Sequence, residues 1–173
     1  MMLMSGCLTA SPFQPEVVDT PEFQPEMFFA GKTTGDGTLV QHWKQPREFR
    51  VDGRGMKDAS DGSFVLEQNV TYDDGATEHR VWHLRQTGAH TYAATLSDAS
   101  GAVTAETKGN TLHLHYLIRQ PAVYMDQWLY LQPDGTTVLN VATVSVLCVP
   151  WARVSERITR AGTGEESGKR LDL

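Results

Sequence analysis

The stretch from residue 64 to residue 82, FVLEQNVTYDDGATEHRVW, contains the pattern that decides the fold. Apolar or aromatic residues stand at positions 64, 66, 70 and 72, and mostly polar residues alternate with them. This period of two is typical of a half-buried β-strand. Asp74-Gly75 supplies the positive φ that a tight hairpin turn needs, and a second run containing Val81 and Trp82 follows it. The stretch therefore predicts an antiparallel hairpin.

The same combination of turn and strand recurs along most of the chain. Turn signals stand at residues 35–37, 52–53, 61–62, 73–75, 88, 100–101, 108–110 and 133–135, between short runs rich in Val, Thr, Tyr, Phe and Trp. Leu112, Leu114 and Tyr116 alternate with polar neighbours, so this strand also has two unlike faces. No stretch of this region carries an apolar stripe with helical period over three turns, which excludes parallel α/β folds.

The number of hairpins predicts the architecture. We expect nine or ten strands from Gly35 to Arg160. Closure is the common way for so many consecutive strands to avoid exposed edges. The fold class is therefore all-β, a single antiparallel up-and-down β-barrel, and a barrel of this size is wide enough for one small apolar ligand.

Composition excludes several classes of partner. The chain has 173 residues, 40% of them hydrophobic, and a formal net charge of −6 with no cluster of basic residues. Nucleic acid is therefore not an expected partner. The longest apolar run, residues 141–151, is too short to cross a bilayer as a helix. The two cysteines have no zinc-type spacing, and we expect Cys148 to be a small buried hydrophobe.

The N-terminal residues resemble the end of a bacterial lipoprotein signal. Ser5-Gly6-Cys7 has the small-small-Cys form in which the cysteine is acylated, and Cys7 is therefore the predicted lipidation site. The apolar stretch before it is about half of the roughly 7 to 15 residues of an export signal. We interpret residues 1–26 as a truncated signal followed by an extended, proline-rich tether, and residues 161–173 as a disordered tail.

Five blocks of the sequence resemble the bacterial family of unknown function catalogued as DUF3833. They are Phe28-Phe29-Ala-Gly31, Val70-Thr-Tyr-Asp-Asp-Gly75 with Arg80-Val-Trp82, Lys108-Gly-Asn110 with Leu112 and Tyr116, Asp126-x-Trp128-Leu-Tyr130-Leu131, and Leu139-Asn140-x-Ala142-Thr143. Their order and spacing agree with the family over residues 27–160. The resemblance implies a lipocalin-like (calycin-type) barrel, usually in a lipoprotein and often encoded near enzymes that modify lipids. It implies no established catalytic activity.

The chain also departs from the family pattern at two places. Similar proteins tend to have acidic residues where this chain has Gln68 and Asn69, and a Ser-Lys-Phe-Gly run where it has Ser145 to Cys148. An amide cannot exchange a proton near neutral pH, so acid–base chemistry at these positions is not expected here. A binding function is compatible with both departures.

Aromatic and charged residues at period-two spacing are the candidate ligand contacts. Asp126, Trp128 and Tyr130 share one strand face, and Arg80 and Trp82 share another. We predict that Arg80, Trp82, Tyr116, Asp126, Trp128 and Tyr130 bind the ligand, with Arg80 and Asp126 as a polar pair near the barrel mouth. The alternative is that the aromatic residues are core side chains and that Arg80 with Asp126 is a structural ion pair.

Other polar residues suggest chemistry less strongly. His113 and His115 project from one face and could join a third ligand, Asp126 or His83, around a metal, but the favoured explanation is two polar residues on the solvent face of a barrel strand. We predict no metal site. Adjacent Asp73 and Asp74 belong to a turn and point to opposite faces, so they are not a catalytic pair. No nucleophile or nucleotide motif is present, so no cofactor is expected.

Three functions remain open from the sequence. The favoured one is a monomeric lipoprotein of the bacterial cell envelope, anchored in the membrane and facing the periplasm, whose barrel binds a lipid or other apolar small molecule. The second is a lipid-modifying or isomerising enzyme that uses Asp126 or the two histidines. The third is a non-catalytic structural or adaptor protein with a barrel filled by side chains, which predicts no internal cavity.

Overall fold

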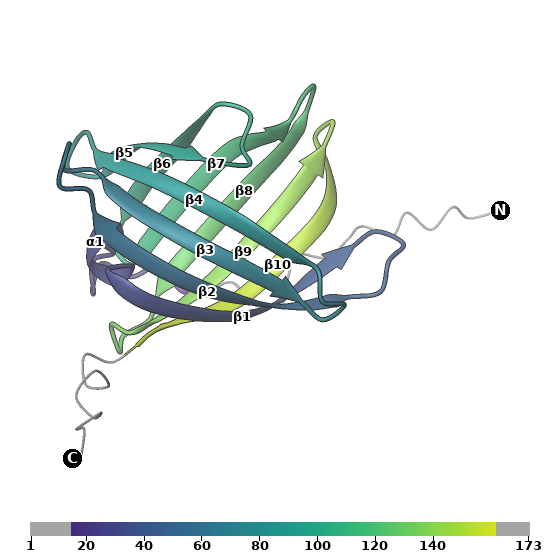
Figure 1. Ribbon diagram of the computed structural model, residues 1–173, viewed down its shortest axis with the longest axis horizontal. Helices are drawn as coiled ribbons and strands as arrows, with labels where there is room; N and C mark the ends of the chain where they lie inside the picture. Colours follow the sequence, from purple (N-terminus) through teal and green to yellow (C-terminus); the bar gives the residue numbers. More distant parts are fainter. Residues whose placement is uncertain (1–14, 162–173) are drawn as a thin grey trace, which may run out of the picture.

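The computed structural model describes residues 15–161, and in this part of the chain ten antiparallel strands form one closed barrel (Figure 1). The strands are β1 (Gly31–Gln41), β2 (Arg47–Lys57), β3 (Phe64–Tyr72), β4 (Thr77–Gln86), β5 (Thr91–Leu96), β6 (Ala102–Lys108), β7 (Thr111–Arg119), β8 (Val123–Leu131), β9 (Thr137–Val146) and β10 (Val149–Arg160). Each strand pairs with its neighbour in sequence, and β10 pairs with β1. The predicted up-and-down barrel is confirmed.

Alternation of side chains gives the barrel its interior. On β7, Leu112, Leu114 and Tyr116 are buried and join the core, whereas His113 and His115 are partly or fully exposed. The same alternation on β5 buries Tyr92, Ala94 and Leu96. Because side chains alternate between the two faces of a strand, the buried residues of β5 and β7 point into one common interior.

The two ends of the barrel differ. At one end lie the connections 58–63, 87–90, 109–110 and 132–136, together with residues 15–30; we call this the closed end. At the other lie the connections 42–46, 73–76, 97–101, 120–122 and 147–148, which we call the open end. In Figure 1 the closed end is on the left with the helix α1 (Pro25–Phe28), and the hairpins of the open end point to the right and upper right.

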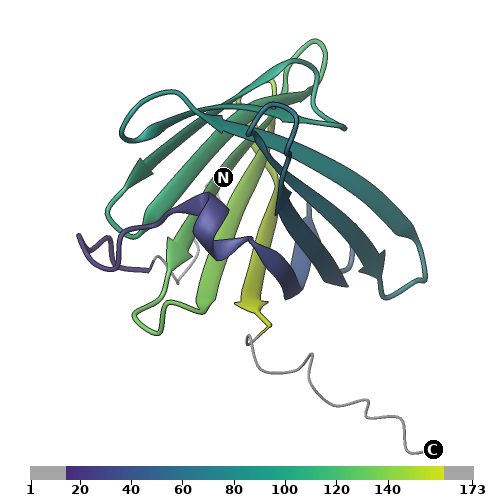
Figure 2. The ribbon, with the colours of Figure 1, turned by 60° about the vertical axis from the view of Figure 1, so that its left-hand side comes forward.

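A short helix and three phenylalanines cover the closed end. The helix α1 (Pro25–Phe28) lies across it, as Figure 2 shows. Phe23, Phe28 and Phe29 are all buried in the barrel core, with ring centroids 5.0 to 6.4 Å apart. We call these residues the aromatic plug. The three rings close this end of the barrel to water, and their burial contributes apolar area to the core.

Backbone contacts fix the segment that precedes the plug. The Phe23 N–H donates to the carbonyl of Gly109, and the Asn110 N–H donates to the carbonyl of Val18. The Asn110 side chain accepts in turn from the Val18 N–H, at 2.9 Å. Gly109 has a φ of +52°, and a Cβ there would stand 2.3 Å from the Val18 oxygen, so glycine permits this close approach.

These contacts show a segment bound to the barrel, whereas the sequence predicts an extended tether. Within the described residues, the segment from Val18 to Glu26 belongs to the folded domain, although the sequence places the boundary after residue 26. The reason is that phenylalanines within the proline-rich stretch bury against the barrel end. Cys7 and the predicted tail from residue 162 lie outside the described residues. No helix within residues 15–161 combines the length and apolar character that crossing a bilayer requires.

Candidate functional site

The barrel encloses a cavity of about 610 Å³ that runs from the aromatic plug to the open end. Pro25 and Phe29 bound it at the closed end, and Arg119, Val146 and Trp151 line it at the open end. Most of the wall between them is aliphatic or aromatic, with Ala142 as a small residue on β9. This volume lies within the range of about 300 to 1,000 Å³ that holds a drug-sized ligand. The cavity is therefore the candidate functional site.

An aromatic wall formed by β4 and β7 faces this cavity. Trp82 and Tyr116 meet edge to face, with ring centroids 5.7 Å apart. The indole Nε1–H of Trp82 donates to the Gln68 side-chain oxygen at 2.9 Å. Burial raises the pKa of Tyr116, so its phenol stays neutral at physiological pH. The wall is apolar, and its geometry is fixed by a hydrogen bond.

Arg80 lies beside this wall but is already paired. Its guanidinium contacts Glu78 at 2.7 Å and Asp98 at 3.1 Å. Burial disfavours the charged form, but the two carboxylates, Asp98 first, outweigh it and raise the pKa of Arg80. Because two acids neutralise one cation, Arg80 is poorly suited to bind an acidic ligand head group.

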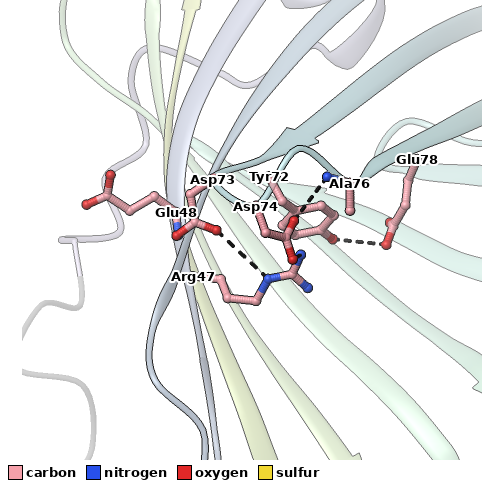
Figure 3. Close-up of polar contacts among 7 residues, drawn as sticks. All are labelled: Arg47, Glu48, Tyr72, Asp73, Asp74, Ala76 and Glu78. Carbon is pink, nitrogen blue, oxygen red and sulfur yellow. Dashed lines mark hydrogen bonds and ion pairs between the residues drawn. The ribbon is translucent and has the colours of Figure 1, made fainter.

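The β3–β4 turn extends this network at the open end (Figure 3). Arg47 contacts the carboxylate of Asp74 at 2.6 Å, and its guanidinium lies 4.1 Å from the centroid of the Tyr72 ring. The Tyr72 hydroxyl donates to Glu78 at 3.1 Å. Asp73 accepts from the Glu48 N–H on the neighbouring strand. Asp73 also lies 4.0 Å from Arg47 Nε, so both aspartates stabilise the turn through Arg47, and neither lines the cavity.

A second polar group lies on the opposite wall of the cavity. The Asn140 side-chain amide donates to Glu156 Oε2 at 2.8 Å, while Asn140 Oδ1 and Glu156 Oε1 are buried and have no hydrogen-bond partner among the described residues. Glu156 fits beside Gly35, where a Cβ would stand 2.0 Å from Oε1. Burial raises the pKa of Glu156, although the hydrogen bond from Asn140 and the charge of Arg80 oppose the shift.

We expect Glu156→Gln to stabilise the protein in a pH-dependent way. The folded state holds the proton of Glu156 more tightly than the unfolded state, so the wild type loses stability as pH rises from the ordinary pKa of 4.5 through the raised folded value. Glutamine has no proton to lose in this range. The free energy of unfolding of the variant should therefore exceed that of the wild type at pH 8, and the gap should close near pH 4, as measured by urea unfolding across this range.

Glu67→Gln is the matched control, because Glu67 is exposed on β3. It should show no pH-dependent gap of this kind. If the difference in free energy of unfolding between Glu156→Gln and the wild type stays constant from pH 4 to pH 8, the placement of an ionisable carboxyl in the cavity wall is contradicted.

The structure divides the six predicted ligand contacts into two groups. Arg80, Trp82 and Tyr116 line the cavity. Three others do not line it: on β8 the inward positions are occupied by Val123, Met125, Gln127 and Leu129, so the side chains of Asp126, Trp128 and Tyr130 are on the outer face. Their predicted inward orientation is wrong. Both faces of β8 carry large apolar residues, and alternation alone therefore does not reveal which face is inside.

The predicted Arg80–Asp126 pair is also wrong. Asp126 contacts His113 instead, with 2.5 Å between Oδ1 and Nε2, and lies 3.8 Å from His115 Nδ1. The imidazole of His113 stacks on Trp128 with ring centroids 4.0 Å apart. This group lies on the outer surface of β7 and β8, and no set of three metal-ligand side chains able to hold an ion is found in the described chain.

The remaining sequence predictions concern single residues. Cys148 is exposed in the β9–β10 turn, so its expected burial is wrong; the chain reverses direction there, and the side chain points to solvent. Gln68 and Val146, at which the chain departs from the family pattern, both line the cavity. Glu156 was not among the predicted residues, although it occupies an inward position of β10 between Val154 and Ile158.

Comparison with known proteins agrees with the fold. A family model described as a protein of unknown function, DUF3833, matches residues 1–160. No curated protein matches the chain. The structure is similar to the S-type phycobiliprotein lyase CPES from Guillardia theta, with a TM-score of 0.63 and 10% identity over 80% of this chain and 91% of that one.

A second solved structure gives the same result. It is a protein of unknown function from the DUF3598 family of Nostoc punctiforme, with a TM-score of 0.61 and 12% identity. The match covers 83% of this chain and 51% of that chain, so the present chain spans about half of that protein's length. At such low identity the two likenesses show a shared lipocalin-like barrel and nothing about ligands.

Proposed function

This chain belongs to the DUF3833 family of proteins of unknown function, and from that premise and its barrel we propose that it binds a lipid or another apolar small molecule. The observation that carries the proposal is the cavity of about 610 Å³ between the plug and the open end. A barrel that served only as a scaffold would fill this space with its own side chains, since protein interiors are closely packed.

The chemistry of the cavity favours a ligand that is mostly uncharged. Its walls are largely apolar. Of the two cations that line it, Arg80 is neutralised by Glu78 and Asp98, and Arg119 lies at the open end. An apolar chain or ring system gains about 25 cal/mol for each Å² that it removes from water. The few polar side chains, such as Gln68 and Asn140, then fix its orientation.

Binding is favoured over catalysis by the position of the candidate catalytic groups. Asp126, His113 and His115 lie on the outer face of the barrel and do not line the cavity. An enzyme that used them would have to act without excluding water. We therefore propose a carrier or binding protein rather than an enzyme.

We further propose that the protein is a lipoprotein of the bacterial cell envelope that faces the periplasm and is anchored through Cys7. This part of the proposal is supported by Ser5-Gly6-Cys7 in the sequence. A monomer is the expected state, because closure of β1 on β10 pairs every strand on both sides.

Mass spectrometry of the full-length protein extracted from its own host membrane tests both parts. Under native conditions we expect a bound apolar molecule, and under denaturing conditions a covalent acyl mass that remains on Cys7. The two signals are distinct because only the ligand is lost on unfolding. An unshifted Cys7 contradicts the anchor, and an empty barrel under every mild extraction condition contradicts the binding function.

A further inference from the structure

Large apolar side chains gather on one part of the open end. Trp43 in the β1–β2 connection is 92% exposed, Leu147 in the β9–β10 turn 68%, Val149 61% and Trp151 41%. His42 joins the two segments, since its ring lies 5.7 Å from both Trp43 and Trp151. We call Trp43, Leu147, Val149 and Trp151 the rim patch. Contiguous exposed apolar groups of this kind mark interaction sites.

The backbone holds some of these side chains outward at a conformational cost. Trp43, Leu147 and Cys148 have φ values of 62°, 50° and 64° and are the non-glycine residues with positive φ in the described chain. Other turns place glycine at such positions, for example Gly75 and Gly135. Bulky residues seldom adopt this conformation, so their presence here is not explained by turn formation.

Charge divides the open end into two halves. Beside the rim patch lie Lys44 and Arg119, both exposed and without an ion pair in the part of the chain that the structure describes. The connections 73–76 and 97–101 on the other half carry Asp73, Asp74 and Asp98. The apolar half of the open end is thus the basic half, and the acidic residues are on the other half.

We propose that the rim patch docks on an anionic lipid bilayer, with Trp43 and Leu147 entering the interface and with Lys44 and Arg119 contacting the head groups. Tryptophan is favoured at the boundary between head groups and acyl chains. Basic residues near an anionic membrane are attracted to its negative surface potential. A membrane fits better than a protein partner, because the apolar residues project from separate turns and the two unpaired charges beside them, Lys44 and Arg119, are both basic.

This orientation gives the cavity access to the bilayer. Trp151 belongs both to the rim patch and to the cavity lining, and Arg119 lines the cavity as well. A docked barrel would therefore present its open end to the acyl chains without an intervening layer of bulk water. The inference goes beyond ligand binding, since docking does not require that the cavity be occupied.

The test is flotation of the full chain with phosphatidylcholine vesicles and with vesicles that also contain phosphatidylglycerol. Cys7→Ser is introduced throughout, so that no acyl group contributes. We expect binding to the anionic vesicles, weaker binding to the neutral ones, and weakening by salt, because a Debye length of about 8 Å at 0.15 M screens exposed charges.

Trp43→Asn with Leu147→Asn removes the apolar contacts without disturbing the turns. Asparagine adopts positive φ more readily than tryptophan or leucine, so thermal stability should be equal or higher. The vesicle partition coefficient should fall by about 10-fold or more, since two large apolar side chains no longer enter the interface. Lys44→Glu with Arg119→Glu should abolish the preference for anionic vesicles.

Controls come from the closed end. Val17 and Met27 are exposed by 52% and 63%, and Val17→Asn with Met27→Asn should leave partitioning unchanged. Lys57→Glu, at the closed-end terminus of β2, should leave the lipid preference unchanged. Equal losses for closed-end and open-end variants overturn the proposal. So does an absence of vesicle binding together with a rim-dependent dimer in sedimentation equilibrium, which would identify a second copy as the occupant.

Discussion

Replacing Ala142 with tryptophan is expected to lower the affinity of the barrel for an apolar fluorescent probe by about 100-fold, which corresponds to about 2.8 kcal/mol. Ala142 is 2% exposed and points from β9 into the cavity. An indole at this position occupies space that the ligand needs, and it cannot move aside because Gln127 and Val154 flank it on the neighbouring strands. The measurement is a titration of the ligand-free protein with the probe.

Two further variants make this result interpretable. Val144→Trp blocks the same wall nearer the open end and should lower the affinity to a similar extent. It provides an independent test if the first variant fails to fold. Thr143→Trp lies between them but points outward, so it should bind the probe with unchanged affinity. If the inward variants fold and bind as tightly as Thr143→Trp, the ligand does not occupy the cavity, and the proposed function fails.

Phe23→Ala is expected to destabilise the protein by about 3 to 5 kcal/mol, the usual cost of deleting a buried aromatic ring. Phe23 is 1% exposed, and its ring contacts those of Phe28 and Phe29. Its loss leaves a cavity at the closed end and admits water to the core. Urea unfolding should show a lower midpoint with an unchanged slope, because the folded barrel itself persists.

Met27→Ala is the matched control for the aromatic plug. Met27 belongs to the same helix but is exposed, so its truncation should change stability by no more than about 0.5 kcal/mol. A loss below about 1 kcal/mol for Phe23→Ala would mean that the segment before β1 is not part of the cooperative unit.

The architecture was predictable because its signals are local. Asp74-Gly75 marks the β3–β4 turn, and the alternation of leucines and histidines on β7 identifies the inner face of that strand. Closure then follows from the number of strands and the cost of exposed edges. Arg80, Trp82 and Tyr116 were placed correctly in the cavity for the same reason, since their neighbours on the strand are clearly outward.

The inner face of β8 was not predictable from its own residues. Its sequence, VYMDQWLYL, is apolar on both faces, and the acidic and aromatic residues suggested a site where the structure has an outer surface. Register would have resolved the question: Trp128 lies directly opposite His113 on β7, and directly opposite residues share a face. The outward position of His113 therefore determines that of Trp128.

Two other features were missed for different reasons. The aromatic plug depends on long-range contacts, such as Val18 with Asn110, that no local pattern specifies. Glu156 had a usable signal, because Ala152, Val154 and Ile158 mark the inner face of β10 and Glu156 shares their phase. An acidic residue in line with the apolar, inward-facing residues of a barrel strand is therefore a candidate cavity residue.

Pairing of the first strand with the last has a consequence for biosynthesis. Thr34 on β1 hydrogen-bonds Thr159 on β10, which is 125 residues away in the chain. The ring of strands cannot be completed until almost the entire polypeptide has left the ribosome, and contacts of such high sequence separation form slowly. Such a delay keeps the nascent chain unfolded for longer than a chain whose contacts are mostly local.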